Sequence, residues 1–401
     1  MLRRFSVSNY RSFKEKAVLD LVVSGRDKGQ GFCRRINDKA AWVSTAAGIF
    51  GANGSGKTAL LRALDFVMDF ATDSAWLKTR EGLSLLPVMP WFNNAAPCHF
   101  ILEWQDRDGH IYEYSLILDR THIVSERLTY TAHEKSSRRD VWLFRQGNEI
   151  REVNGVFSGL NYDNLKDRAS FIPMAVAQGA KLDSILVPIR IVRHFDSDYS
   201  ERLPLAVRTE VSKFLLNLIL IGAEKGVFLE KINDFLCRSD LGLSGIEVEE
   251  KEDKLDEKGQ ATLQIYGVHT LADGRIVRLP IALESEGTRV LLTYFPLIYI
   301  AFQNGTPLIL DEFDAALHFS MQERILDMFD DPDMNPHGAQ IIFATHSENL
   351  MNKLGKAHIY LAEKCDCESA FLRLDSLAGV RSSDNYSRKY LSGFYGGLPL
   401  L

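Results

Sequence analysis

The chain has 401 residues, of which 46% are hydrophobic and 25% charged, and its formal net charge is −6. This composition is typical of a globular protein with room for two or three packed units, and a run of about 18 apolar residues, as a membrane span needs, does not occur. Dedicated nucleic-acid binders are usually basic, so the acidic balance does not require nucleic acid as a partner, although DNA binding in a groove between two subunits stays open.

The first elements predict a phosphate-binding loop between a strand and a helix. Arg3 and Arg4 precede a strand rather than an apolar leader, so no signal peptide is expected and the cytoplasm is the expected compartment. Residues 46–50 are a short apolar run, and residues 59–67 have the apolar spacing of a helix. Between them, residues 51–58 read GANGSGKT and fit the pattern G-x-x-x-x-G-K-[ST] in the context that this motif requires.

This loop predicts a site for ATP and Mg²⁺. Its glycines let successive N–H groups point at phosphates, and the following helix adds its positive end. We expect Lys57 to reach the β- and γ-phosphates and Thr58 to be a ligand of Mg²⁺. The expected nucleotide-binding residues of the loop are Asn53, Gly54, Ser55, Gly56, Lys57 and Thr58.

The middle of the chain predicts two further parts. Residues 98–160 alternate apolar and polar side chains between turn-forming residues, which predicts an antiparallel β unit. Residues 199–240 have helical spacing, residues 246–255 resemble a charged strand or hairpin arm, and residues 263–268 resemble another strand. No heptads continue over three repeats, so we expect a lid or a module for oligomerisation or partner binding rather than a coiled coil.

The second half predicts the remainder of the nucleotide site. The apolar residues 306–310 predict a buried parallel strand, and Asp311 follows at its carboxyl end. Asp311 is the expected Mg²⁺ ligand and Glu312 the expected base that polarises water; the alternative is a helix-capping acidic pair. Residues 340–345 predict another strand, which delivers His346 as a γ-phosphate sensor.

The tail and the cysteines are less specific. Tyrosines and glycines after residue 385 favour either docking to a partner or an adjacent subunit, or a C-terminal strand packed on its own core. The five cysteines are scattered, and Cys365-Asp-Cys367 has no second pair, so reduced thiols are expected rather than a zinc site.

These motifs together resemble the ABC-type ATPase heads of the SMC/RecF class. Residues 5–13, FSVSNYRSF, are similar to the N-terminal strand of that class, and residues 285–288, SEGT, are similar to its signature motif. Residues 284–288, 311–318 and 385–397 resemble one bacterial branch, the AAA-type ATPases of phage-defence and abortive-infection loci. That branch includes the RloA-like proteins and the ATPases of the PARIS and Septu systems.

The resemblance implies an α/β fold, a P-loop NTPase head of the ABC type, to which the residue patterns add an antiparallel β unit and a mainly helical insert. The implied domains are an N-terminal ATPase lobe at 1–175, the insert at 176–279 and a C-terminal ATPase lobe at 280–401. Two heads would sandwich two ATP molecules, which implies a homodimer or a higher even number of subunits.

In that sandwich, Ser285 and Gly287 of one subunit would contact the γ-phosphate bound by Lys57 of the other, and Asp314 would take the D-loop position. The alternative interpretation of residues 285–288 is an ordinary helix N-cap. Glu286 departs from the family pattern, which usually has a small residue there.

Two further positions are left open. Arg11 either approaches the nucleotide or is an exposed residue at the end of a strand. Gln178 either belongs to the glutamine loop or is a packed loop residue.

The resemblance therefore predicts a slow ATPase that acts as the sensor or scaffold of a bacterial anti-phage system. Since the sequence shows no nuclease motif, the killing chemistry is assigned to an effector protein encoded nearby. The alternatives are a RecF-like clamp that binds duplex DNA in an ATP-dependent way, and a metabolic ATPase without a role in defence.

Overall fold

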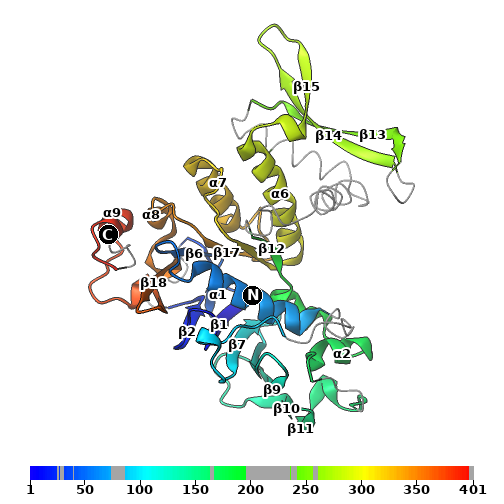
Figure 1. Ribbon diagram of the computed structural model, residues 1–401, viewed down its shortest axis with the longest axis vertical. Coiled ribbons are helices and arrows are strands. Elements are labelled where there is room, and N and C mark those ends of the chain that lie inside the picture. Colours follow the sequence, from blue (N-terminus) through cyan, green and yellow to red (C-terminus); the bar gives the residue numbers. More distant parts are fainter. Residues whose placement is uncertain are drawn as a thin grey trace. The chain divides into compact units, whose positions relative to one another are not determined.

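The computed structural model forms two compact units (Figure 1). The first contains residues 1–194, 300–313 and 323–401, and the second contains residues 195–299 and 314–322. No helix among the described residues is long and apolar enough to cross a membrane. The structure describes residues 1–24, 27, 31–38, 40–73, 86–162, 167–195, 235, 242–255 and 261–396.

The ATPase core of the first unit is a six-stranded sheet with the order β12-β16-β17-β6-β18-β19. The first five strands are parallel, and β19 pairs antiparallel with β18. Every residue of β6, β16 and β17 is buried, as expected for central parallel strands covered on both faces. The strands are β6 (Ala46–Phe50), β12 (Val192–His194), β16 (Pro307–Leu310), β17 (Gln340–Ala344), β18 (Ile359–Cys365) and β19 (Glu368–Arg373).

This sheet confirms the predicted strands at 46–50, 306–310 and 340–345, and the predicted helix is α1 (Lys57–Thr72). The order places the carboxyl ends of β6, β16 and β17 side by side, because all three strands run parallel. Loops that follow these strands therefore meet at one edge of the sheet.

The second sheet is antiparallel, with the order β11-β10-β9-β8-β7-β1-β2. It confirms the predicted β unit, but β1 pairs directly with β7, so the N-terminal strand belongs to the same sheet. Strand β8 alternates buried and half-buried residues along its whole length. The strands are β1 (Leu2–Ser8), β2 (Ala17–Asp20), β7 (Cys98–Gln105), β8 (Ile111–Leu118), β9 (Ile123–Thr131), β10 (Asp140–Gln146) and β11 (Glu149–Val153).

Smaller elements complete the first unit. The three-stranded sheet β3-β5-β4 packs its buried Val23 and Cys33 with Ala357 and Trp42. The elements are β3 (Val22–Val23), β4 (Cys33–Arg34), β5 (Trp42–Ser44), α2 (Phe171–Ala177), α3 (Asp183–Leu186), α8 (Leu350–Leu354) and α9 (Tyr386–Leu391). Helix α7 (Phe319–Asp330) has residues 319–322 in the second unit and residues 323–330 in the first.

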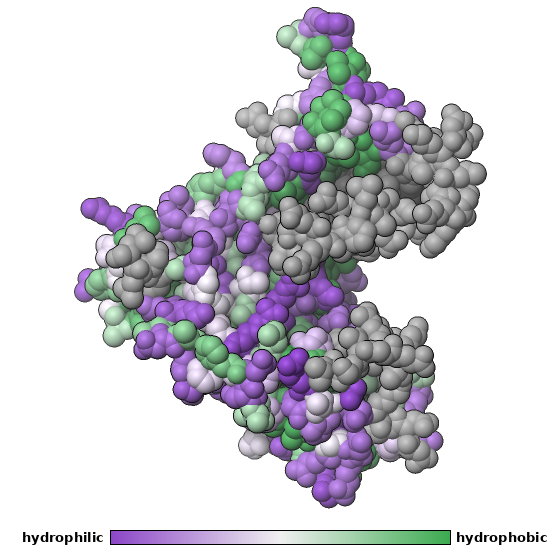
Figure 2. All heavy atoms as spheres, in the orientation of Figure 1, coloured by the Kyte–Doolittle hydropathy of each residue, from purple (hydrophilic) through white to green (hydrophobic). Residues whose placement is uncertain are grey.

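The second unit contains a three-stranded antiparallel sheet, β13-β14-β15, followed by residues 286–299 of α6 (Glu286–Asn304). Its strands are β13 (Gly245–Leu255), β14 (Ala261–Thr270) and β15 (Ile276–Pro280), which confirms the strands predicted at 246–255 and 263–268. The edge strand β15 exposes Ile276 and Val277, and the β14–β15 arm carries hydrophobic spheres in Figure 2. The helical prediction for 199–240 lies outside the described residues except for Phe235, which packs on Phe295.

The tail forms a helix rather than the strand considered in the sequence analysis. Tyr386, Tyr390 and Tyr395 are buried, so these tyrosines pack within the chain. Asn385 caps α9 by accepting a hydrogen bond from the N–H of Arg388.

Candidate active site

A cavity of about 310 Å³ lies at the edge of the six-stranded sheet where β6, β16 and β17 end. Ten predicted site residues line it together, all of them from the first unit. Ser12, Ala59, Ala344 and Thr345 complete the lining and were not predicted. The ten predicted residues are Arg11, Asn53, Gly54, Ser55, Gly56, Lys57, Thr58, Asp311, Glu312 and His346.

The shape of the phosphate loop depends on two glycines that the β18–β19 hairpin approaches closely. A Cβ atom on Gly51 would lie 2.1 Å from the carbonyl oxygen of Ala362, and one on Gly56 would lie 2.6 Å from Oγ of Ser369. Gly56 also has a φ of 113°, a backbone conformation that residues other than glycine rarely adopt. Both positions therefore require glycine for steric reasons.

Lys57 is held inside this loop. Its side chain is buried, and Nζ donates to the carbonyl oxygens of Gly51 at 2.8 Å and Ala52 at 3.0 Å. Gly56 is the N-cap of α1 and supplies no side-chain hydrogen bond to the first turn. The amino end of α1 and the ammonium group of Lys57 consequently offer positive charge to the same cavity, which suits phosphate.

The residues proposed to hold Mg²⁺ are in direct contact. Thr58 Oγ1 donates to Asp311 Oδ1 at 3.2 Å, and the Asp311 side chain is buried. Burial raises the pKa of Asp311, while the hydrogen bonds from Thr58 and from the N–H of Glu312 oppose that change. A hydroxyl and a carboxylate oxygen side by side fit the oxygen donors that Mg²⁺ prefers.

Glu312 follows Asp311 in a left-handed backbone conformation, with a φ of 52°. Non-glycine residues adopt this conformation at a cost, and such residues cluster at functional sites. The turn aims an exposed Glu312 into the cavity that His346 also lines. Since α7 begins only at Phe319, neither acidic residue caps that helix, and the helix-capping alternative is not supported.

The predicted signature motif lies in the second unit, at the start of α6. Ser285 Oγ accepts a hydrogen bond from the N–H of Thr288 at 3.2 Å and lies 2.7 Å from the Thr288 hydroxyl, so Ser285 caps the helix. Glu286 is exposed in the first turn, where its negative charge interacts favourably with the helix dipole. The single chain thus shows the capping role, and the contact with a second subunit stays a prediction.

Gly287 lets the signature motif pack closely against the loop that contains Asp314. A Cβ atom on Gly287 would lie 2.9 Å from the carbonyl oxygen of Ala316, which has a φ of 57°. The carbonyl oxygen of Asp314 accepts from the N–H of Leu317, which shapes this loop. The second unit therefore packs the signature helix and the 314–317 loop against each other.

Gln178 has a structural role at the end of α2. Its exposed side chain accepts from the N–H of Asn161 at 2.8 Å and donates to the carbonyl oxygen of the same residue at 2.9 Å. Gln178 is absent from the described residues that line the cavity. This supports the packed-loop alternative.

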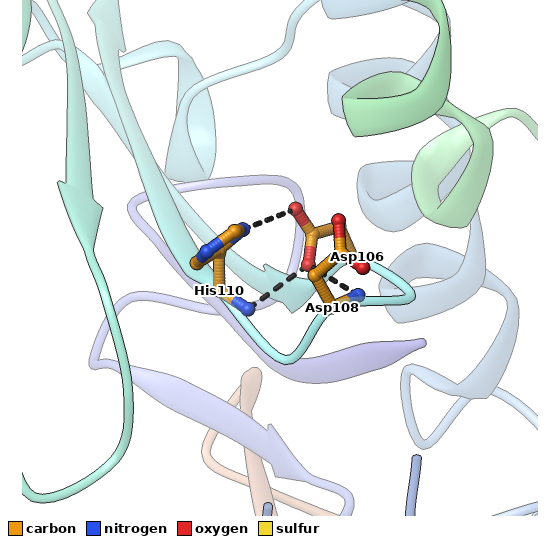
Figure 3. A group of neighbouring side chains, drawn as sticks. All are labelled: Asp106, Asp108 and His110. Atoms are coloured by element: carbon orange, nitrogen blue, oxygen red, sulfur yellow. Dashed lines mark hydrogen bonds and ion pairs between the residues drawn. The ribbon is translucent and has the colours of Figure 1, made fainter. Parts of the chain in front are cut away.

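A second group of metal-type side chains lies in the β7–β8 turn, where Asp106, Asp108 and His110 place ligand atoms within 4.8 Å of one another (Figure 3). The sequence analysis missed this group. Asp106 Oδ1 accepts from the N–H groups of Asp108 and His110, and Oδ2 accepts from the hydroxyl of Tyr112 and lies 3.0 Å from Nδ1 of His110. Both oxygens of the Asp106 carboxylate are therefore occupied by partners within the turn, and the group is explained as a turn that its aspartate stabilises.

Comparison with known proteins agrees with the site. Residues 46–352 match the family described as "AAA domain, putative AbiEii toxin, Type IV TA system", and the chain therefore belongs to this family. Together with the P-loop strand order, this defines an α/β ATPase of the P-loop class, related to abortive-infection proteins. No curated protein matches the chain.

Two solved structures show a distant likeness. The SMC head domain from Thermotoga maritima is 14% identical, with a TM-score of 0.41, and covers 93% of this chain and 98% of its own. The structure titled "Structure of the recombination mediator protein RecF-ATPrS in RecFOR pathway" is 12% identical, with a TM-score of 0.36. It also covers 93% of this chain and 98% of its own. Because both scores are below 0.5, neither likeness bears on function.

Proposed function

We propose that the chain is an ATP-binding and ATP-hydrolysing switch of a bacterial anti-phage system, which controls a partner effector by nucleotide-dependent assembly. One observation carries the proposal. A single cavity combines Lys57 in a phosphate loop, the Thr58–Asp311 pair and the side chains of Glu312 and His346. The abortive-infection family supports the assignment to defence.

The residues divide the work of the proposed reaction. Lys57 and the amino end of α1 bind and orient the phosphates, and Glu312 accepts a proton from the attacking water. His346 lies where it can sense the terminal phosphate. Thr58 and Asp311 would hold Mg²⁺, which neutralises phosphate charge when bound.

The assembly step places Ser285 and Gly287 on the nucleotide of a second subunit. Ser285 is exposed at the amino end of the long helix α6, a position that favours contact with a phosphate. A head-to-head pair with two nucleotides follows from this arrangement, and ATP would act as the signal that closes it. The effector, for which a nuclease encoded nearby is the leading candidate, would respond to the closed state.

The biochemical test compares Lys57→Ala and Glu312→Gln with the parent protein. Lys57→Ala should lose ATP binding, because it removes the ammonium charge that contacts the phosphates. Glu312→Gln should bind ATP, stop hydrolysis and accumulate the closed assembly in size-exclusion chromatography with ATP. Normal turnover in Glu312→Gln would show that the base assignment is wrong. Lys353→Ala, which removes a surface ion pair to Asp327, is the matched lysine control.

The biological test is phage plaquing on bacteria that express the gene with its chromosomal neighbours. Protection should disappear with Lys57→Ala and persist with Lys353→Ala. Protection that survives Lys57→Ala would contradict an ATP-gated module. If no phage in a broad panel is restricted, the defence role fails, and ATP-dependent DNA binding becomes the next activity to measure.

A further inference from the structure

The turn at residues 9–14 brings Arg11 to the nucleotide cavity through an unusual backbone. Asn9 and Arg11 both have positive φ values, 51° and 49°, although neither is glycine. Hydrogen bonds between the backbones of Tyr10 and Phe13, at 2.8 and 2.9 Å, close the turn. A strained turn of this kind persists only if its surroundings hold it in place.

The surroundings are the segment 89–98, which is remote in sequence. The N–H of Arg11 donates to the carbonyl oxygen of Met89 at 2.7 Å, so the left-handed residue is itself tied to this segment. The Lys14 ammonium lies 4.8 Å from the centroid of the Trp91 ring. Phe92 and Asn93 also have positive φ values, 46° and 54°, so the segment is as tightly turned as the one it supports.

The side chain of Asn9 connects the two strained segments. Its Nδ2 donates to Asn94 Oδ1 at 3.0 Å and to the carbonyl oxygens of Ala96 at 2.8 Å and Pro97 at 3.1 Å. Its Oδ1 accepts from Asn94 Nδ2 at 2.8 Å and from the N–H of Trp91 at 3.3 Å. The two asparagines therefore form a reciprocal amide pair, and every donor and acceptor of Asn9 is used.

Arg11 itself is supported from one more side. Its guanidinium lies 5.6 Å from the centroid of the Tyr10 ring, and Tyr10 is buried against Phe100 in an edge-to-face contact. The exposed guanidinium can thus line the cavity while its stem stays fixed.

We propose that Asn9 is a positioning residue for nucleotide binding: its amide network holds the 89–98 segment against the 9–14 turn and so fixes Arg11 at the phosphate loop. The inference rests on the proposed ATP-binding function. Asn9 is not among the described residues that line the cavity, so its effect has to pass through the turn, which supplies Arg11 and Ser12 to the lining. The proposal assigns the effect to Arg11, the charged residue of the two. If the hydrogen bonds of Asn9 served stability alone, the effect of an Asn9 variant on nucleotide binding would not depend on Arg11.

The test is a double-mutant cycle with Asn9→Gly and Arg11→Ala in the full chain. Glycine accepts a φ of 51° without strain, so Asn9→Gly removes the amide network and leaves the backbone conformation allowed. The measurement is the Kd of the fluorescent analogue mant-ATP with Mg²⁺, together with the thermal midpoint of each variant. Asn154→Gly is the matched control, because it removes two side-chain hydrogen bonds, to Val141 and Glu152, from another loop of the same antiparallel sheet.

We expect Arg11→Ala to weaken mant-ATP binding about tenfold, as for the loss of one charge-assisted contact. Asn9→Gly should weaken it to a similar extent, and the double variant should be no weaker than Arg11→Ala. Asn154→Gly should leave the Kd unchanged. If the two losses multiply, or if Asn9→Gly changes only the thermal midpoint, the inference is overturned.

Failure of the inference is distinguishable from failure of the proposed function. If Arg11→Ala binds mant-ATP normally while Lys57→Ala does not, ATP binding stands and the role of Asn9 falls. If Lys57→Ala binds normally, the function itself is wrong. Asn94→Ala breaks the reciprocal amide pair and the hydrogen bond from the N–H of Ala96, but leaves the other bonds of Asn9, so it serves as a milder second variant. Normal binding by this variant and by Asn9→Gly would also overturn the inference.

Discussion

A buried histidine gives the chain a defined sensitivity to acid. His358 is buried, its Nδ1 lies 2.6 Å from Ser44 Oγ, and its ring packs edge-to-face on Phe32. The Ser44 hydroxyl donates to the carbonyl oxygen of Ala46, so it accepts the proton of Nδ1 from a neutral imidazole. Burial, with a smaller contribution from the positive charge of Arg373, lowers the pKa of His358 to about 4.

The sign and size of the effect follow from proton linkage. Between about pH 6.5 and pH 4 the unfolded chain binds a proton at His358 and the folded chain does not, so the free energy of unfolding falls with falling pH. Above about pH 6.5 neither state is protonated, and the group has no effect on the pH dependence. At pH 5 the loss is about 2 kcal/mol, and it approaches about 3 kcal/mol at pH 4.

The assay is urea unfolding at pH 7.5 and pH 5.0, followed by tryptophan fluorescence, since Trp42 packs on the cluster next to His358. His358→Gln should be less stable than the parent at pH 7.5 but should lose about 2 kcal/mol less on acidification. The control is His133→Gln, which removes an exposed histidine and should keep the parental pH dependence. If the parent and His358→Gln respond equally to pH, His358 is not held neutral and the reasoning is refuted.

Three other perturbations have expected outcomes. Gly56→Ala forces a side chain into a 2.6 Å approach at a φ of 113°, so ATP binding measured by calorimetry should fall at least about tenfold. Glu126→Ala removes the buried 2.7 Å ion pair with Arg145 and should cost about 3–5 kcal/mol in unfolding experiments. Glu113→Ala, which removes a half-buried glutamate paired with the exposed Arg139, should cost less than about 1 kcal/mol. Asp311→Asn should abolish the dependence of mant-ATP binding on Mg²⁺, and an unchanged Mg²⁺ titration would contradict its assignment as a ligand.

The sequence was informative where chemistry forces a particular residue at a particular spacing. Gly56, Lys57 and Thr58 are neighbours where the loop meets α1, and the motif specifies these residue types at this fixed spacing. Asp311 was placed correctly because it follows an apolar run that could only be a buried strand. Local patterns of this kind predict most of the residues that line the cavity.

The sequence was uninformative where a contact depends on distant parts of the chain. Nothing near Asn9 indicates that its amide would pair with Asn94, 85 positions away. The pairing of β1 with β7 is equally remote and joins the β unit to the N-terminal strand. The β18–β19 hairpin turns at Asp366 and Cys367, two non-glycine residues with positive φ, so it lacked the glycine that would have indicated a turn.

Ser285 is the residue for which the two available interpretations lead to opposite results. As a helix cap it uses Oγ to accept the N–H of Thr288, and aspartate performs that role as well as serine. As a contact for the phosphates of a second subunit, the same position cannot carry a negative charge. Ser285→Asp therefore keeps the cap and removes the contact, whereas Ser285→Ala weakens the cap by about 1 kcal/mol and adds no charge.

The comparison belongs in a Glu312→Gln background, where the closed assembly should accumulate with ATP. We expect Ser285→Asp to keep the thermal midpoint and the mant-ATP affinity of a single subunit but to stay open in size-exclusion chromatography. Asn385→Asp adds the same charge to the exposed cap of α9 and should still close. If Ser285→Asp closes as readily as Asn385→Asp, Ser285 is only the cap of α6, and a nucleotide shared between two subunits is no longer a reason to expect an even-numbered assembly.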